Sequence, residues 1–292
     1  MASALLLGAL RAEGKRRSES VGSLSESAVQ QEFVAGLLDA LHRSEKETLK
    51  GRVKRIQAVL DRIAERLGMP EIPTAKGPPH RILLERREAA SLGGLFRGGD
   101  WRITVDEKLL TRGPMSVEQI VRLADILGHE LRHPEHRFRM ACWLADSGRT
   151  SDIVLLTVPK HIINEALRPG RPRLDRKRAA EAKHWFSAWL LPERKKNAEE
   201  LSQAYAAQAR ARLRQAELQR QLAQVGTPRS AIEGKELKAL RKALGEATKE
   251  ESRWSQEVGR IHQAGEKLPL ERDCQRIGQE VARWVARLMG GR

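Results

Sequence analysis

The chain has 292 residues, enough to bury a sizeable core in one large domain or two. Its 54 basic and 38 acidic residues give a net charge of +16, which favours anionic partners such as nucleic acid or phospholipid headgroups. Two cysteines, Cys142 and Cys274, exclude a disulfide-rich framework and predict a chain made in a reducing cytosol, although one bridge between them stays open.

The first ten residues contain a short apolar run with no cation before it, which is a poor secretory signal. No segment reaches about 18 uninterrupted apolar residues, so we expect no membrane-spanning helix. We expect synthesis in the cytoplasm. Action outside the cell would require specialised export without a cleaved signal peptide.

The first third of the chain predicts a tail followed by helices. Residues 11–28 are polar and predict a mobile tail. Apolar residues then recur at helical intervals over 28–67, which predicts one long helix or a helical pair. Prolines and glycines over 69–79 predict a linker.

Residues 91–105 predict a β-hairpin, because short apolar runs flank a glycine-rich turn at 98–100. In the second strand, Trp101, Ile103 and Val105 alternate with polar residues, as in a half-buried strand. This strand either offers a free edge to an extended peptide or only covers the core.

Ser116 and Gln119 form a capping-box pattern, which predicts a helix over 117–133. Pro134 lacks the N–H that would continue the helix and is predicted to kink or end it. A second helix should then end near 146–148, and a further apolar helix should occupy 151–168.

From 174 to about 260 the composition is typical of long exposed helices or a coiled coil. A break at 226–229 predicts two antiparallel helices. Residues 171–260 hold 21 basic and 12 acidic residues. This basic arm either is a solvated surface or docks a partner, a membrane or nucleic acid. The last helix should bury an apolar stripe of Leu270, Cys274, Ile277, Val281, Val285 and Leu288.

The predicted helix 117–133 carries His129, Glu130 and His133 in the pattern H-E-x-x-H. Residues four apart share one helix face, which suits two nitrogen ligands of a tetrahedral zinc ion. Glu130 lies about 100° away around the helix and can reach a zinc-bound water without ligating the metal. Gly128 lets another backbone or a substrate approach closely.

A catalytic zinc needs a third protein ligand. Glu271 borders the apolar stripe of the last helix, where a carboxylate is unfavourable unless a cation is its partner. Asp273 either orients a ligand or contacts the motif helix. The alternative is that it is a charge at the helix start that interacts with the helix dipole. The other candidate third ligands are Glu135, which lies too close in sequence, and then Glu165, Glu199 and His161.

The H-E-x-x-H motif followed by Glu135 and Phe138, with residues 101–106 before it, resembles the zincin domains of bacterial toxins and secretion-system effectors. Residues 268–278 are similar to the segment that donates the glutamate of a His, His, Glu site in such domains. Cys274 stands where those domains usually have a small Ala. The resemblance covers roughly 85–168 and 260–290.

The resemblance implies a mainly α fold with a small β-hairpin or sheet (α+β), built as a zincin-like core with a long helical-hairpin (coiled-coil) insertion. The expected domains are an N-terminal tail and helices (1–75), the zincin core (76–170), the basic insertion (171–260) and a helix completing the core (261–292). Expected partners are a protein or peptide substrate and a secretion chaperone, immunity or carrier protein.

The resulting hypothesis is a Zn²⁺-dependent peptidase with His129, His133 and Glu271 as ligands. Zinc would lower the pKa of its bound water and polarise the scissile carbonyl, while Glu130 acts as general base. Oxyanion donors would come from His262, His136 or Arg132. The alternatives are a non-catalytic zincin-like scaffold whose basic arm binds a partner, and a protease that docks on nucleic acid through that arm.

Overall fold

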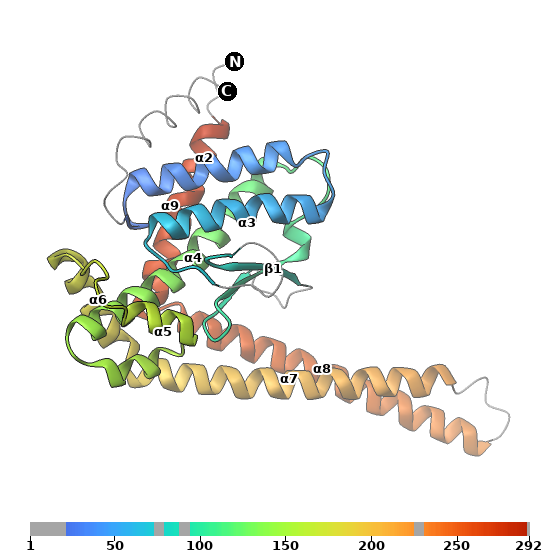
Figure 1. Ribbon diagram of the computed structural model, residues 1–292. Coiled ribbons are helices and arrows are strands. Elements are labelled where there is room, and N and C mark those ends of the chain that lie inside the picture. Colours follow the sequence, from blue (N-terminus) through green and yellow to red (C-terminus); the bar gives the residue numbers. More distant parts are fainter. Residues whose placement is uncertain (1–21, 73–78, 88–93, 225–230, 291–292) are drawn as a thin grey trace. The chain divides into compact units, whose positions relative to one another are not determined.

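The computed structural model describes residues 22–72, 79–87, 94–224 and 231–290 (Figure 1). This part of the chain is mainly helical with one small sheet, which confirms the predicted fold class. Its helices and strands are α2 (Ser27–Arg43), α3 (Leu49–Arg66), β1 (Leu83–Arg87), β2 (Gly94–Arg97), β3 (Arg102–Asp106), α4 (Val117–Asp146), α5 (Lys160–Ala166), α6 (Arg176–Trp189), α7 (Pro192–Gln224), α8 (Ala231–Gly265) and α9 (Pro269–Gly290), with short 3-10 helices at Glu107–Leu109 and Thr150–Leu156.

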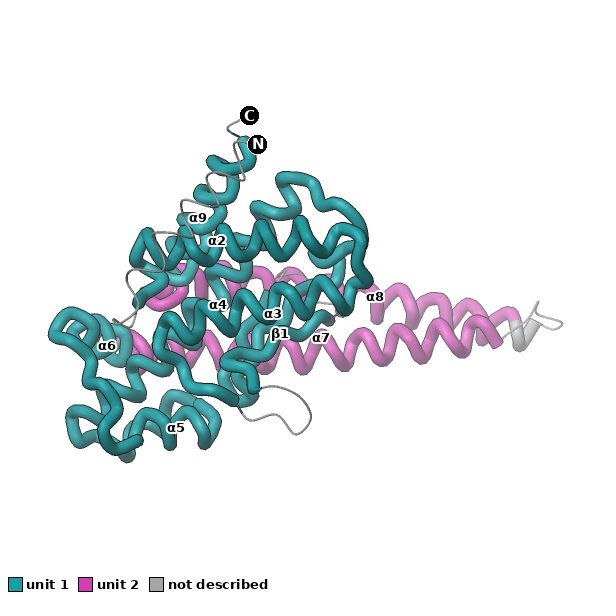
Figure 2. The backbone as a smooth tube through the Cα atoms, turned by 45° about the horizontal axis from the view of Figure 1, so that its top comes forward, with its two compact units in different colours: residues 1–187, 272–292 teal, residues 188–271 magenta. Residues whose placement is uncertain are grey.

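The chain divides into two compact units, one of residues 1–187 and 272–292 and the other of residues 188–271 (Figure 2). The second unit therefore begins and ends later in the chain than the 171–260 insertion expected from the sequence. The two elements that cross a unit boundary are α6 and α9.

The second unit is built on the hairpin of α7 and α8. Its small apolar core contains Ala204, Val258 and Ile261. Gln208 donates to Ser255 and Arg212 to Glu251, so residue numbers rise along one helix as they fall along the other. This pairing confirms the two predicted antiparallel helices, whereas the predicted break at 226–229 lies outside the described residues.

In the first unit, α2 and α3 form the predicted helical pair, and the Thr48 side chain caps α3 by accepting from Gly51 N–H. The prediction of a mobile tail over 11–28 is wrong for its described end. Gly22 N–H donates to the Arg66 carbonyl, and the Leu24 side chain is fully buried. Burial of an apolar side chain therefore holds this segment in place, although its polar composition predicted a mobile tail.

The sheet has the order β1-β3-β2, with β1 parallel and β2 antiparallel to β3. The β2–β3 pair is the predicted hairpin. Of the two alternatives left open for 101–105, the structure excludes the free edge, because β3 is paired on both sides and the edge strands are β1 and β2. The sequence of β1, Leu83 to Arg87, has no apolar alternation that could have predicted it.

Helix α4 begins at the predicted capping box, in which Ser116 and Gln119 exchange both hydrogen bonds. The prediction that it could end at Pro134 is wrong, and so is the separate helix after it, because α4 continues to Asp146. The residues beyond the proline bury a continuous apolar face, and this burial outweighs one missing hydrogen bond. The buried apolar side chains there are Phe138, Met140, Ala141, Cys142 and Leu144.

The single helix predicted over 151–168 is instead two short helices, Thr150–Leu156 and α5. Pro159 stands at the N-cap of α5 with extended backbone, and Thr157 adopts a left-handed φ of 51°. A residue before proline is disfavoured in helical geometry, which explains the break.

Two glycines bring α9 directly against α4. A Cβ on Gly128 would lie 3.3 Å from Gly278 Cα, and a Cβ on Gly278 would lie 2.6 Å from the Asp125 carbonyl oxygen. Gly128 therefore serves the close approach of another backbone, which was one of its two predicted roles. The predicted stripe is confirmed at Cys274, Ile277, Val281 and Val285, which are fully buried.

Gly278→Ala is expected to lower the free energy of unfolding by about 1–3 kcal/mol, because the added methyl forces the two helix backbones apart. Gly245→Ala is the control, since a Cβ there meets no atom within 4 Å, and it should be neutral or stabilising. Urea unfolding monitored by circular dichroism measures both, and equal stability of the two variants would contradict the close packing.

No helix in the described part of the chain has the length and apolar character needed to cross a bilayer. Cys142 and Cys274 are both buried and form no disulfide, so the bridge that the sequence left open is absent.

Candidate metal centre

Helix α4 places His129, Glu130 and His133 together, as the motif predicts. Their ligand atoms all lie within 4.8 Å of one another, and the Nε2 atoms of His129 and His133 are 3.3 Å apart. Two nitrogens bound at 2.0–2.1 Å to one tetrahedral zinc ion stand about 3.3 Å apart. The two imidazoles are therefore spaced as adjacent zinc ligands.

The carboxylate of Glu130 is held in place by the edge strand β2. The Phe96 backbone N–H donates to Glu130 Oε2 at 2.6 Å, and the side chain is only 7% exposed. A Cβ on Gly94 would lie 2.4 Å from Ile126 and 3.2 Å from Glu130, so β2 runs against this face of α4. Glycine at this position makes the close approach feasible.

The ring of Phe96 also covers the site. It stacks on His133 with ring centroids 6.2 Å apart and 12° between the planes, and it meets Trp101 edge to face at 5.3 Å. Trp101 is fully buried in a left-handed conformation at φ 53°. The β2–β3 hairpin thus supplies both the donor to Glu130 and an aromatic wall beside the second histidine.

Asp273 on α9 contacts the motif helix through two side chains. Its Oδ2 accepts from Arg132 Nε at 2.8 Å and from His136 Nε2 at 2.7 Å, and its Oδ1 accepts from Arg276. Burial acts to raise the pKa of Asp273, but the hydrogen bond from His136 and the charge of Arg132 hold it far below its ordinary value. Burial lowers the pKa of His136, and this effect outweighs the hydrogen bond to Asp273, which acts to raise it.

Behind Asp273 lies a second, fully buried ion cluster. Glu135 pairs with Arg132 and Arg139, and it accepts further hydrogen bonds from the Ser23 hydroxyl and the Leu24 backbone. Burial acts to raise the pKa of Glu135, but the two guanidinium groups keep it below its ordinary value. Glu135 is thus bound to cations on its own helix.

The three proposed oxyanion donors have partners in the structure. Arg132 and His136 both donate to Asp273, which confirms the predicted contact of Asp273 with the motif helix. His262 lies in the second unit, where its Nε2 is 2.7 Å from the Tyr205 hydroxyl. These contacts favour structural roles for all three.

The remaining candidate ligands lie elsewhere. His161 on α5 belongs to neither metal-capable group found among the described residues, and its Nε2 has no hydrogen-bond partner there. It lines a cavity of about 1030 Å³ together with Phe138 and Cys142. Glu165 pairs with Arg168, and Glu199 pairs with Lys195 on the surface of α7.

Glu271 stands in the first turn of α9, three residues before Cys274. It is grouped with the second unit, where its charge acts on Arg194 and His262. Like His161, it belongs to neither metal-capable group found among the described residues, and its ligation of the metal stays a prediction.

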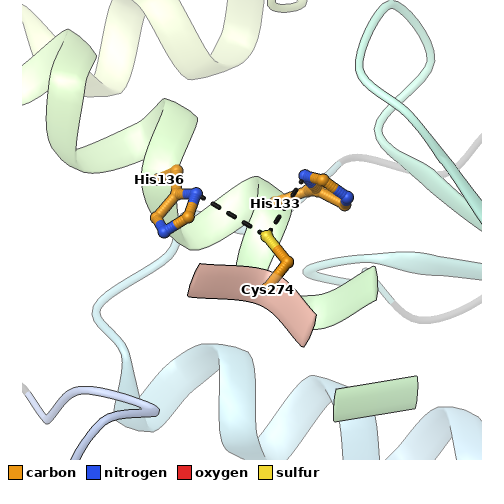
Figure 3. Close-up of side chains that lie close together, drawn as sticks. All are labelled: His133, His136 and Cys274. Carbon is orange, nitrogen blue, oxygen red and sulfur yellow. Dashed lines mark hydrogen bonds between the residues drawn. The ribbon is translucent and has the colours of Figure 1, made fainter. Parts of the chain in front are cut away.

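Sequence reasoning missed a second group, made of His133, His136 and Cys274 (Figure 3). Cys274 Sγ lies 3.4 Å from His133 Nδ1 and 3.8 Å from His136 Nδ1. The spacing of the two histidines, three apart on one helix, could have indicated this group. Its third member comes from a distant helix, and no local pattern could have supplied it.

The chain was compared with known proteins in three ways. It matches no family model, no curated protein and no solved structure, so the zincin resemblance stays a prediction that rests on the residues and geometry described above.

Proposed function

We propose that the chain is a zinc-dependent peptidase, with the metal held by His129, His133 and Glu271. The observation that carries the proposal is the 3.3 Å separation of the two histidine Nε2 atoms beside a carboxylate, from H-E-x-x-H on a buried helix. This donor set of two imidazoles with a nearby acid is the one that catalytic zinc uses.

The third ligand is supplied by the start of α9. On this helix, Asp273 and Cys274 contact α4. Glu271 precedes them by two and three residues, and its carboxylate would complete a His, His, Glu donor set.

Bound zinc would polarise the scissile carbonyl and lower the pKa of a water at the site. Glu130 takes a proton from the attacking water and delivers it to the leaving amine. The Phe96 N–H fixes the orientation of this carboxylate, so little reorganisation is needed when the proton moves.

The substrate class that fits this chemistry is a protein or peptide. The basic residues of the arm are in part neutralised by neighbours within it, as in the pairs Arg212–Glu251 and Arg260–Glu257. This pairing favours a solvated surface for the arm over a docking site for nucleic acid or an anionic membrane. The alternative function is a non-catalytic scaffold, and the zinc content of the purified protein tests it.

Purified protein dialysed against zinc-free buffer is expected to retain close to one zinc per chain. His129→Ala and Glu271→Ala should each lose most of it, whereas His42→Ala, which removes an exposed histidine on α2, should keep it. Elemental analysis measures the ratio. A zinc-free wild type would refute the proposal, and full retention in Glu271→Ala alone would refute only the third ligand.

A further inference from the structure

The proposed peptidase has no use for the thiol of Cys274 or for the ring of His136, yet both converge on His133. The thiol comes from α9 and the two rings from consecutive turns of α4 (Figure 3). All three residues belong to the first unit. Two imidazoles and one thiolate are ligands that Zn²⁺ and Cu⁺ favour.

The spacing within this group fits one metal ion. A sulfur at 2.3 Å and a nitrogen at 2.0–2.1 Å from a tetrahedral zinc ion stand about 3.6 Å apart. The observed distances from Cys274 Sγ to the two Nδ1 atoms, 3.4 Å and 3.8 Å, lie on either side of that value. Small side-chain movements would therefore be enough to bind an ion.

The neighbours of His136 fix its tautomer and orient its ring for metal binding. A carboxylate accepts but does not donate, so the 2.7 Å contact with Asp273 places the ring proton on Nε2. The Nδ1 lone pair is then directed at Cys274. A carboxylate that binds the far nitrogen of a metal-ligating histidine is the usual supporting arrangement. Arg132 and Arg276 hold this carboxylate in position.

His133 is common to both groups. Its Nε2 faces His129, and its Nδ1 faces Cys274. A neutral imidazole has one lone pair, so a metal ion on Nδ1 requires the proton on Nε2 and removes that nitrogen from the first group.

We propose that His133, His136 and Cys274 form a second metal site, for a thiophilic ion such as Cu⁺ and more weakly for Zn²⁺, that competes with the H-E-x-x-H site for His133. The second site stands on its own geometry, whereas the competition rests on the proposed peptidase function. A thiophilic ion other than zinc, such as Cu⁺, would then inhibit the zinc-loaded enzyme by binding His133 in the second site.

The binding test is a Co²⁺ titration of the metal-free, full-length protein, followed through the near-ultraviolet charge-transfer band that a thiolate ligand gives to cobalt. We expect the band in His129→Ala, in which the H-E-x-x-H site no longer competes for His133, and its loss when Cys274→Ser is added. Cys142→Ser is the matched control and should keep the band, because Cys142 is the other buried cysteine and burial raises its pKa to about 12. Circular dichroism establishes that each variant is folded.

His129→Ala without the band at saturating Co²⁺, or a band that persists when Cys274→Ser is added to it, overturns the second site. A band in His129→Ala supports it even if the protein cleaves no peptide, so the two proposals fail separately. For the competition, one equivalent of Cu⁺ added under reducing conditions to the zinc-loaded protein should reduce wild-type peptidase activity at least tenfold and should affect Cys274→Ser far less. Equal inhibition of the two proteins would overturn the competition.

Discussion

Glu130→Gln is expected to abolish peptide hydrolysis while the protein keeps its zinc. An amide matches the carboxylate in size and can still accept the Phe96 N–H, so the fold around β2 should survive. It cannot take a proton from water, and loss of a general base lowers the rate by about 10²–10⁴-fold. Cleavage of a fluorogenic peptide library, with zinc measured by elemental analysis on the same samples, tests both halves of the expectation.

Glu118→Gln is the control for this variant, because Glu118 is an exposed carboxylate in the first turn of the same helix. It should cleave peptides at close to the wild-type rate. Full activity in Glu130→Gln would end the general-base mechanism, and loss of zinc in that variant would show that the side chain serves the metal instead of the proton.

Local chemistry made several elements predictable from the sequence. The capping box at Ser116 fixed where α4 begins, and the glycine-rich turn at 98–100 fixed the β2–β3 hairpin. The apolar period of α9 predicted its buried face, and the motif itself placed His129 and His133 side by side. Each of these depends on residues within about two helical turns of one another.

The features that could not be predicted depend on tertiary contacts, which a local sequence pattern does not contain. Pro134 removes one backbone hydrogen bond and was expected to interrupt α4, but burial on both sides of it favours a continuous helix. The partners of Glu135, Ser23 and Leu24, lie 112 and 111 positions away in the chain. Cys274 lies 141 positions from His133. Such pairs become visible only in the folded chain, where segments far apart in sequence meet on α4.

Glu135→Gln is expected to have the largest effect on stability. The substitution leaves the guanidinium groups of Arg132 and Arg139, whose side chains are each 2% exposed, without their shared countercharge. Removing one partner of a buried ion pair costs about 3–5 kcal/mol. The exposed pair of Asp39 and Arg43 provides the control, since Asp39→Asn should cost no more than about 1 kcal/mol. Urea unfolding at pH 7 measures both.

The difference in stability between wild type and Glu135→Gln should also depend on pH. The folded-state pKa of Glu135 lies below its ordinary value of 4.5, so its ionisation stabilises the fold above that pH. This contribution is lost as the pH falls from about 4.5 through the depressed folded-state pKa. The stability difference between wild type and Glu135→Gln should therefore be constant from pH 7 to 5 and shrink below about 4.5, where the unfolded carboxyl binds its proton first. A difference that stays constant down to pH 3 would show that the charge on Glu135 is not what stabilises its contacts with Ser23, Leu24 and the two arginines.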